Sequence, residues 1–181
     1  FAVRIEAILA VGVINSREAD SALAKVISRS AKSMNRLSST TRDAIVLSAT
    51  GRGLAILKQL AGSPEGQQVI FDDRELTRQL IQTAAGDDSN KMKRWVESIA
   101  SQDDQQPWVA AVIAGWAITH RKHIAQDELD DRVRNVLDRC TRADSQDVDA
   151  LTSVELLAEG WPDGKIDSER LVQFISVNQS D

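Results

Sequence analysis

The sequence predicts an all-α chain, and three observations support that prediction. Apolar residues recur at three- and four-residue spacing along the whole sequence, as they do in helices with one buried face. No sustained two-residue alternation occurs, and no Asn-Gly or Asp-Gly turn joins two β-branched runs. Only three prolines are present, and each lies where a helical pattern breaks: Pro64, Pro107 and Pro162.

Ten helices follow from this periodicity. In chain order they cover Val3–Ile14, Arg17–Lys32, Thr41–Gly51, Gly53–Leu60, Asp73–Ala85, Asn90–Ser101, Pro107–His120, Gln126–Cys140, Asp147–Glu159 and Asp167–Ser176. Several begin beside a residue that can accept a hydrogen bond from a free helix amide: Ser16, Ser39 or Thr40, Asp72, Ser89 and Ser145. Pro107 suits a first helical turn, where its missing N–H costs nothing.

The ends of the helices are marked mainly by glycine. Gly62, Gly86 and Gly160 stand where chain reversal calls for left-handed backbone geometry. The tight link Gly51-Arg52-Gly53 separates two paired helices, and no Gly-Lys-Ser/Thr follows it as a phosphate loop would require. The turn Trp161–Gly164 joins the last two helices.

A stripe of large aliphatic residues and alanines that closes on glycine occurs five times. The closing glycines are Gly12, Gly51, Gly86, Gly115 and Gly160. They are spaced 39, 35, 29 and 45 residues apart, a mean of 37. A period near forty built from two helices is typical of HEAT and armadillo repeats. We therefore predict an α-α superhelix of about five helix pairs, a single HEAT-like solenoid domain over residues 1–181.

The phrases that carry these stripes also resemble a known family. Residues 3–10 (VRIEAILA), 41–48 (TRDAIVLS) and 108–115 (WVAAVIAG) are similar to the HEAT-repeat region of large bacterial extracytoplasmic proteins. In that family the region joins a β-propeller resembling quinoprotein sugar dehydrogenases to a c-type cytochrome. The resemblance implies a periplasmic or secreted parent protein, in which this segment is a connector. The sequence contains no Cys-x-x-Cys-His haem attachment motif, so we expect the cytochrome elsewhere in that parent.

Composition limits the classes of function. The single cysteine, Cys140, excludes an internal disulfide and a multi-cysteine metal cage. The net charge is −5, but residues 1–62 hold nine Lys/Arg against four Asp/Glu, whereas residues 63–181 hold thirteen against twenty-three. The acidic remainder argues against nucleic-acid wrapping. The best apolar run, Trp108–Thr119, is shorter than the roughly 18–20 residues of a membrane span, so no membrane insertion is expected. Because the sequence starts at Phe1 without methionine, we expect a segment of a larger protein.

His120 and His123 are the only histidines, and their three-residue spacing on a helix would place both on one face. A shared metal is geometrically possible, although a closed site needs further ligands. We favour a role at the helix C-terminus and expect no metal or other cofactor in this segment. Cys140 is interpreted as a small buried hydrophobe. Paired carboxylates such as Asp72-Asp73 and Asp103-Asp104 stand where helices begin, so we interpret them as caps.

Four tryptophans remain as candidates for partner binding: Trp95, Trp108, Trp116 and Trp161. They could anchor packing between repeats, which we favour, or form an exposed aromatic patch at an interface. The repeats without a catalytic constellation predict a scaffold or inter-domain connector, not an enzyme, whose partner is a protein or a neighbouring domain. That connector could also cradle a haem- or quinone-bearing module.

The alternative function is a HEAT-like DNA-binding protein or DNA glycosylase. It rests on basic residues of the N-terminal part that could line a groove: Arg17, Lys25, Arg29, Lys32, Arg36 and Arg42.

Overall fold

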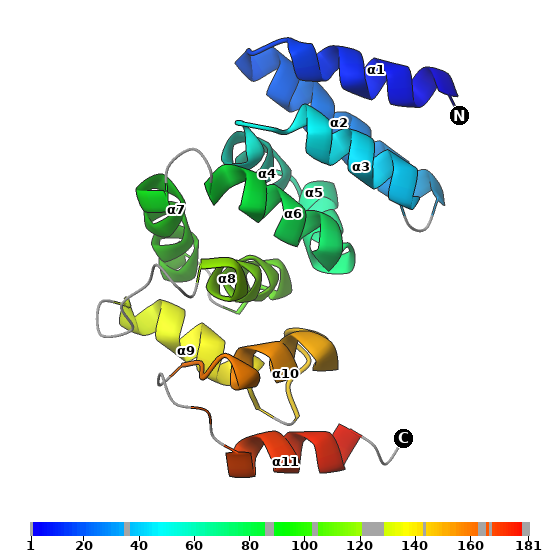
Figure 1. Ribbon diagram of the computed structural model, residues 1–181. Helices are drawn as coiled ribbons and strands as arrows, with labels where there is room; N and C mark the ends of the chain where they lie inside the picture. The colour runs from blue at the N-terminus through cyan, green and yellow to red at the C-terminus, as the bar shows by residue number, and fades with distance from the viewer. Residues whose placement is uncertain are drawn as a thin grey trace. The chain divides into compact units, whose positions relative to one another are not determined.

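The computed structural model describes residues 2–34, 37–85, 89–102, 105–120, 129–142, 144–162, 166 and 168–178. In these ranges the chain forms eleven α-helices and no strand, which confirms the all-α prediction (Figure 1). The helices are α1 (Ala2–Val13), α2 (Arg17–Met34), α3 (Ser39–Ser48), α4 (Gly53–Ala61), α5 (Pro64–Asp72), α6 (Arg74–Ala85), α7 (Ser89–Gln102), α8 (Pro107–His120), α9 (Asp131–Cys140), α10 (Ala150–Ala158) and α11 (Ser168–Asn178).

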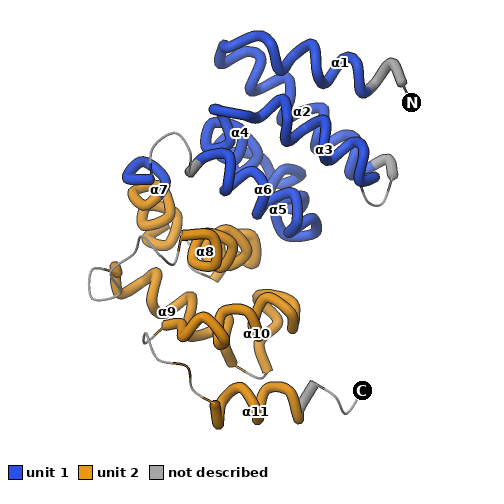
Figure 2. Tube along the Cα trace, in the orientation of Figure 1, with its two compact units in different colours: residues 1–92 blue, residues 93–181 orange. Residues whose placement is uncertain are grey.

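The chain divides into two compact units, unit 1 (Phe1–Met92) and unit 2 (Lys93–Asp181), coloured in Figure 2. The sequence predicted one repeat domain over the whole length.

Unit 1 stacks its helices in two rows, the arrangement of a helical-repeat solenoid. In one row α1 packs on α3, and α3 contacts α6; in the other, α2 packs on both α4 and α5 (Figure 1). Small residues allow this close approach. A Cβ atom built on Gly53 would lie 2.2 Å from the Leu80 carbonyl oxygen, and one on Gly66 would lie 2.1 Å from that of Leu60. Glycine at these positions lets helix backbones touch.

Polar links between neighbouring helices hold the unit 1 rows in register. The Ser48 hydroxyl donates to the Ile8 carbonyl across 3.0 Å, joining α3 to α1. The Arg42 guanidinium lies 3.2 Å from the Asp73 carboxylate, which also caps α6 by accepting from the Leu76 amide. These bonds satisfy polar groups that would otherwise be buried without partners.

Helix α5 was not predicted, and this is a correction to the sequence analysis. Pro64 was interpreted as a break in the helical pattern, but it occupies the first turn of α5. Ser63 precedes it in extended geometry and accepts a hydrogen bond from the Gly66 amide at 3.2 Å. A capping serine followed by proline and glutamate is a helix start, because proline loses no helical hydrogen bond there.

Several predicted helix limits shift by one to three residues. Ser38, not Ser39 or Thr40, caps α3, and Asp73, not Asp72, caps α6. Helix α10 begins after Asp149 instead of at Asp147, because the Asp149 carboxylate accepts from the Thr152 amide at 2.8 Å. The predicted start of the eighth helix at Gln126 lies outside the described residues, and α9 itself begins after its cap Asp130.

Two of the three glycine predictions can be compared with the structure. Gly160 has a φ of 80°, as a left-handed turn requires, so the prediction for it is confirmed. Gly51, for which no left-handed geometry was predicted, also has a positive φ, of 74°. Gly62 has a φ of −77°, so it ends α4 in right-handed geometry, and the prediction for it was wrong. Because α5 begins at Pro64, two residues after Gly62, the chain passes from α4 into α5 without a left-handed residue. Gly86 lies outside the described residues.

Unit 2 is organised around α8. Every residue from Val109 to Ala117 is buried, and α8 packs on α9 and α10. Helix α10 in turn packs on α11. The core of both units consists mainly of alanine, valine, leucine and isoleucine. Among the described residues, no helix has the length and apolarity needed to cross a membrane.

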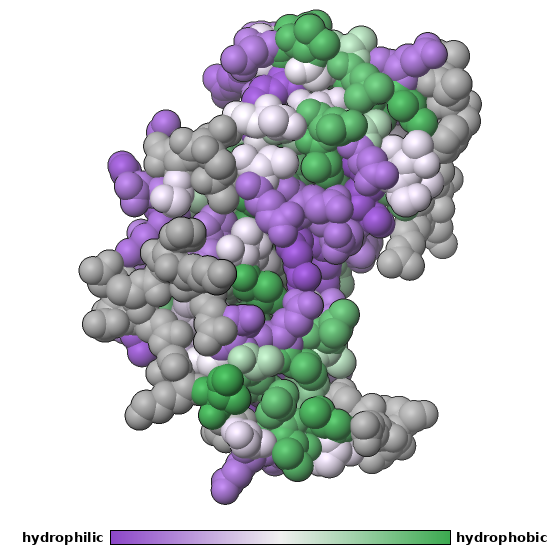
Figure 3. Space-filling model, viewed as in Figure 1, coloured by the Kyte–Doolittle hydropathy of each residue, from purple (hydrophilic) through white to green (hydrophobic). Residues whose placement is uncertain are grey.

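Apolar side chains also reach the surface in each unit. In unit 1 they are Leu9, Val13, Ile14 and Leu47, which lie on or directly after α1 and on α3. In unit 2 they include Leu151 of α10 with Val172 and Ile175 of α11. Hydrophobic surface is visible over these elements in Figure 3.

Candidate functional site

A line of three open cavities follows α2 in unit 1. The apolar cavity, of about 540 Å³, lies between the C-terminal half of α2 and helix α5, and is lined by Ser28, Ala31, Lys32, Leu37, Pro64, Glu65, Gln68, Val69, Asp72 and Asp73. The basic cavity, of about 460 Å³, is lined by Ser21, Ala24, Lys25, Ser28, Arg29, Lys32, Gln59, Gly62, Ser63 and Glu65. We call this surface the α2 groove.

The cavities are continuous because neighbouring ones share residues. Ser28, Lys32 and Glu65 line both the apolar and the basic cavity. A third cavity, of about 550 Å³, extends the groove toward the start of α2 and shares Lys25 and Gln59 with the basic cavity. The groove therefore runs along nearly the whole of α2.

The groove face of α2 follows from its helical period. Lys25, Ser28 and Lys32 are spaced by three and four residues, so they lie on one side of the helix. Leu23 and Ile27 take the opposite side and are fully buried. Helix α2 therefore keeps one face in the core while it presents a row of cations to the groove.

Within the described residues these cations form no ion pair. Lys25, Arg29 and Lys32 are exposed, and no ion pair or hydrogen bond of their side chains is found in the part of the chain that the structure describes. Glu65 is the one acidic residue that lines the basic cavity, whereas Glu65, Asp72 and Asp73 line the apolar cavity. The basic cavity consequently has an excess of positive charge, because Lys25, Arg29 and Lys32 face the single carboxylate of Glu65.

The other end of the groove is more apolar. Ala31, Leu37, Pro64 and Val69 line the apolar cavity beside polar groups that are already engaged. Asp73 is buried against the Arg42 guanidinium, and the Asp72 carboxylate accepts a hydrogen bond from the Gln68 amide at 2.8 Å. The groove thus combines a cationic end with an apolar end.

Four of the basic residues on which the alternative nucleic-acid interpretation rests line the α2 groove: Arg17, through the third cavity, with Lys25, Arg29 and Lys32. Arg42 does not contribute, because it is bound to Asp73, and Arg36 lies outside the described residues. The groove itself was missed because its second wall is α5. The Ser-Pro-Glu helix start at residue 63 was the signal that could have revealed it.

Of the two histidines that the sequence offered as weak metal-ligand candidates, the structure describes only His120. His120 is 4% exposed in α8, and its Nδ1 lies 3.1 Å from the Trp116 carbonyl oxygen of the preceding turn. His123 lies outside the described residues. Within the described ranges, no three His, Cys, Asp or Glu side chains gather as a metal site would require.

The four tryptophans fall into two classes. Trp116 and Trp161 are each 2% exposed, so neither presents its ring to a partner in this structure. Trp95 of α7 and Trp108 of α8 are half-buried. Cys140 is fully buried, at the C-terminal end of α9. The four rings are thus divided between the interior of unit 2 and partly covered positions.

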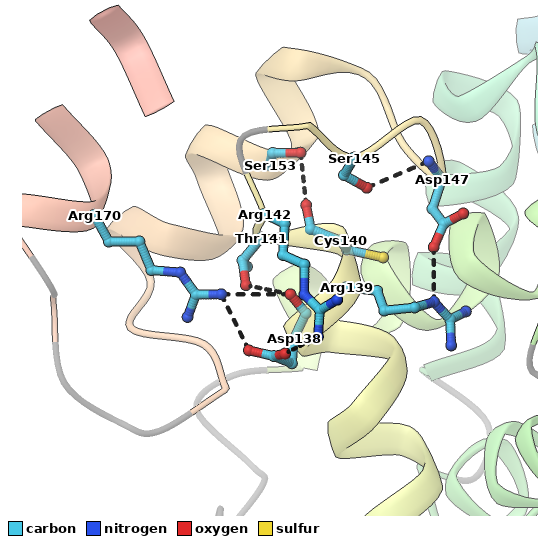
Figure 4. A network of polar contacts seen from close by, with 9 residues as sticks. All are labelled: Asp138, Arg139, Cys140, Thr141, Arg142, Ser145, Asp147, Ser153 and Arg170. Carbon is cyan, nitrogen blue, oxygen red and sulfur yellow. Dashed lines mark hydrogen bonds and ion pairs between the residues drawn. The ribbon is translucent and has the colours of Figure 1, made fainter. Parts of the chain in front are cut away.

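A polar network joins α9 to α10 and α11 in unit 2 (Figure 4). The Ser153 hydroxyl donates to the Cys140 carbonyl across 2.7 Å, and Arg139 lies 3.0 Å from the Asp147 carboxylate. Asp138 accepts from both Arg142 and Arg170, which come from α9's end and from α11. These contacts tie successive helices together and open into no cavity described above, so we interpret the network as structural.

The electrostatics of Asp138 fit that interpretation. Burial works to raise the pKa of its carboxyl, but the hydrogen bonds and positive charges of Arg142 and Arg170 together outweigh it and hold the pKa below its ordinary value of 3.8. The carboxylate is therefore stabilised in its charged form by the two helices that it links.

In comparisons with known proteins, no family model, curated protein or solved structure matches the sequence.

Proposed function

We propose that the chain is a non-catalytic docking scaffold of the HEAT type, which holds a partner protein or a neighbouring domain in the α2 groove. The observation that carries this proposal is the pairing of a cationic row, whose charge exceeds that of the facing Glu65, with an adjoining apolar cavity. Protein interfaces commonly combine an apolar centre with charged residues that orient the partner.

The repeat architecture supports the same role. Helix α2 packs on α4 and α5, so its exposed face is held on a rigid base. A preformed groove binds a partner without first ordering its own residues, which reduces the entropic cost of association.

The biological setting is part of the proposal and comes from the family resemblance. In an extracytoplasmic redox protein with a propeller and a cytochrome module, the segment would be the connector between them. The groove would then receive a part of one of those modules, and the chain would lie in the periplasm or outside the cell. The connector would affect electron transfer by positioning its neighbours.

Nucleic acid is the second candidate, because Arg17, Lys25, Arg29 and Lys32 all line the groove. Phosphate backbones bind through such basic rows. Glu65 and Asp72 on the opposite wall favour the protein partner, since a polyanion filling the groove would meet their carboxylates. Most of the residues that line the apolar cavity also cannot bind phosphate: four are apolar, namely Ala31, Leu37, Pro64 and Val69, and three are the carboxylates Glu65, Asp72 and Asp73.

A display experiment tests the docking function. The immobilised protein is panned against a library of random peptides, and enriched clones are compared on the wild type and on Ser28→Trp, whose indole would fill the junction of the apolar and basic cavities. Gln82→Trp on the exposed face of α6 is the matched control. We expect clones that bind the wild type and the control but not Ser28→Trp. If no enriched clone depends on Ser28, with both variants folded by circular dichroism, docking in the groove is rejected.

A further inference from the structure

We infer that the α2 groove takes an acidic peptide segment with an apolar anchor: carboxylates against the cations of α2 and an apolar side chain in the apolar cavity. This inference rests on the proposed docking function and names its partner chemistry. It follows from the order of charge and apolarity along the groove.

The cations set the spacing of the acidic residues. Lys25 and Lys32 are seven residues apart on α2, which is about 10 Å along a helix that rises 1.5 Å per residue. An extended peptide advances about 3.3 Å per residue, so carboxylates about three residues apart would match both lysines. Arg29 lies between them and offers a guanidinium fork for a further carboxylate.

The charge balance favours an anionic partner over a neutral one. Three like charges on one helix face repel one another, and a carboxylate between them would relieve that repulsion. Lys32 and Glu65 line both principal cavities, and among the described residues the apolar cavity adds Asp72 and Asp73 but no further cation, so the acidic part of the partner is expected to stop at Lys32.

The apolar cavity supplies the anchor. Leu37, from the connection between α2 and α3, meets Pro64 and Val69 of α5 around it. An apolar cavity of roughly 150 Å³ already accommodates benzene, so the space of about 540 Å³ has room for a leucine or phenylalanine side chain. Leu37 is almost fully buried and so belongs to the apolar interior of unit 1. An apolar side chain of the peptide that packs beside it would extend that apolar interior.

Synthetic peptides test the inference directly. The probe is a fluorescein-labelled peptide in which a stretch of aspartate and glutamate is followed by leucines. Comparison peptides replace the acids by asparagine and glutamine, replace them by lysine, or replace the leucines by serine. Binding is measured by fluorescence anisotropy to the wild type, to Arg29→Glu, and to Lys58→Glu, an exposed charge reversal on α4 outside the cavities described above.

We expect the acidic peptide to bind at least about fivefold more weakly to Arg29→Glu, whereas Lys58→Glu changes its affinity less than about twofold. Affinity should fall as NaCl rises from about 50 to about 500 mM, because the ion pairs are exposed and are screened. Both the amide peptide and the serine peptide should bind more weakly than the probe.

The failures of the two proposals can be told apart. Peptides whose binding depends on Ser28 but is indifferent to acidic residues and to Arg29→Glu would overturn the partner chemistry and leave docking intact. A short DNA duplex that binds in an Arg29-dependent way, while no peptide does, would overturn both in favour of nucleic acid. An acidic peptide that binds equally to wild type, Arg29→Glu and Ser28→Trp would also overturn both.

Discussion

Arg52 and Asp20 form a buried ion pair that fixes the start of the helical stack in unit 1. Their side chains are only 8% and 12% exposed, and 3.2 Å separates the guanidinium Nη1 from the carboxylate Oδ1. The same guanidinium donates to the Ile14 carbonyl after α1 and, at 2.7 Å, to that of Ser48 in α3. One side chain thus links α2 to the ends of two other helices, and it holds in place the helix that carries the groove.

Replacing Arg52 by leucine should destabilise the protein by about 2–4 kcal/mol, because the change leaves Asp20 as a buried charge without its partner and removes hydrogen bonds to two carbonyls. Urea unfolding followed by circular dichroism measures the change. Lys58→Met, on the exposed face of α4, is the control and should shift the free energy of unfolding by less than about 0.5 kcal/mol. Equal effects of the two substitutions would remove Arg52 from this structural role.

Two glycines of α4 and its end provide a matched test of close helix packing. A Cβ atom at Gly53 would collide with the backbone of α6 at Leu80, whereas one at Gly62 meets nothing closer than 3.4 Å. Gly53→Ala should therefore destabilise by about 1–3 kcal/mol, and Gly62→Ala should be neutral or slightly stabilising. Thermal unfolding of both variants decides the question. If Gly53→Ala is as stable as Gly62→Ala, then α4 and α6 do not approach as described.

The pH dependence of stability should carry opposite contributions from two aspartates. The pKa of Asp138 is held below 3.8 in the folded chain, so the stability that it contributes is present above that pH and is lost as pH falls through the lowered pKa. Burial raises the pKa of Asp20 despite the nearby positive charge of Arg52, so its contribution declines as pH rises above 3.8.

Asp138→Asn should therefore flatten the loss of stability on the acid side, whereas Asp20→Asn should steepen it. The free energy of unfolding in urea, measured at intervals from about pH 2 to about pH 6, gives both profiles. Profiles that run parallel to that of the wild type would show that neither carboxyl titrates differently in the folded and unfolded chains.

In unit 2 the most buried of the polar links is the Ser153 hydroxyl on the Cys140 carbonyl. Ser153→Ala should cost about 1–2 kcal/mol, because it removes a 2.7 Å hydrogen bond and leaves a buried carbonyl without that donor. Ser176→Ala, on the exposed side of α11, should cost less than about 0.5 kcal/mol. Hydrogen exchange of the α10 amides should quicken in the first variant alone; unchanged exchange would argue against the link.

Much of the fold could be predicted because helical periodicity is local. Regular apolar spacing predicted α1, α2 and α8 nearly to their ends. Where prediction failed, at α5, two local signals competed: Pro64 disfavours a helix interior but suits a first turn. Only the capping geometry of Ser63 decides between them.

The candidate site was less predictable because it depends on contacts between distant segments. The cations of α2 could be recognised as a helix face, but Pro64 and Val69 become the opposite wall only when α5 packs on α2. The burial of individual tryptophans could not be predicted from the sequence either. Trp116 and Trp161 have the same side chain as Trp95, and only tertiary packing makes the first two inaccessible.

The most direct test of the central claim is the amide chemical-shift footprint of the acidic, leucine-containing peptide on the isotope-labelled protein, whose mass of 19.9 kDa suits the method. We expect shifts concentrated in residues 21–32 and 62–72, the two walls of the α2 groove. Shifts confined to the exposed apolar residues of α10 and α11, or the absence of any shift at saturating peptide, would contradict it.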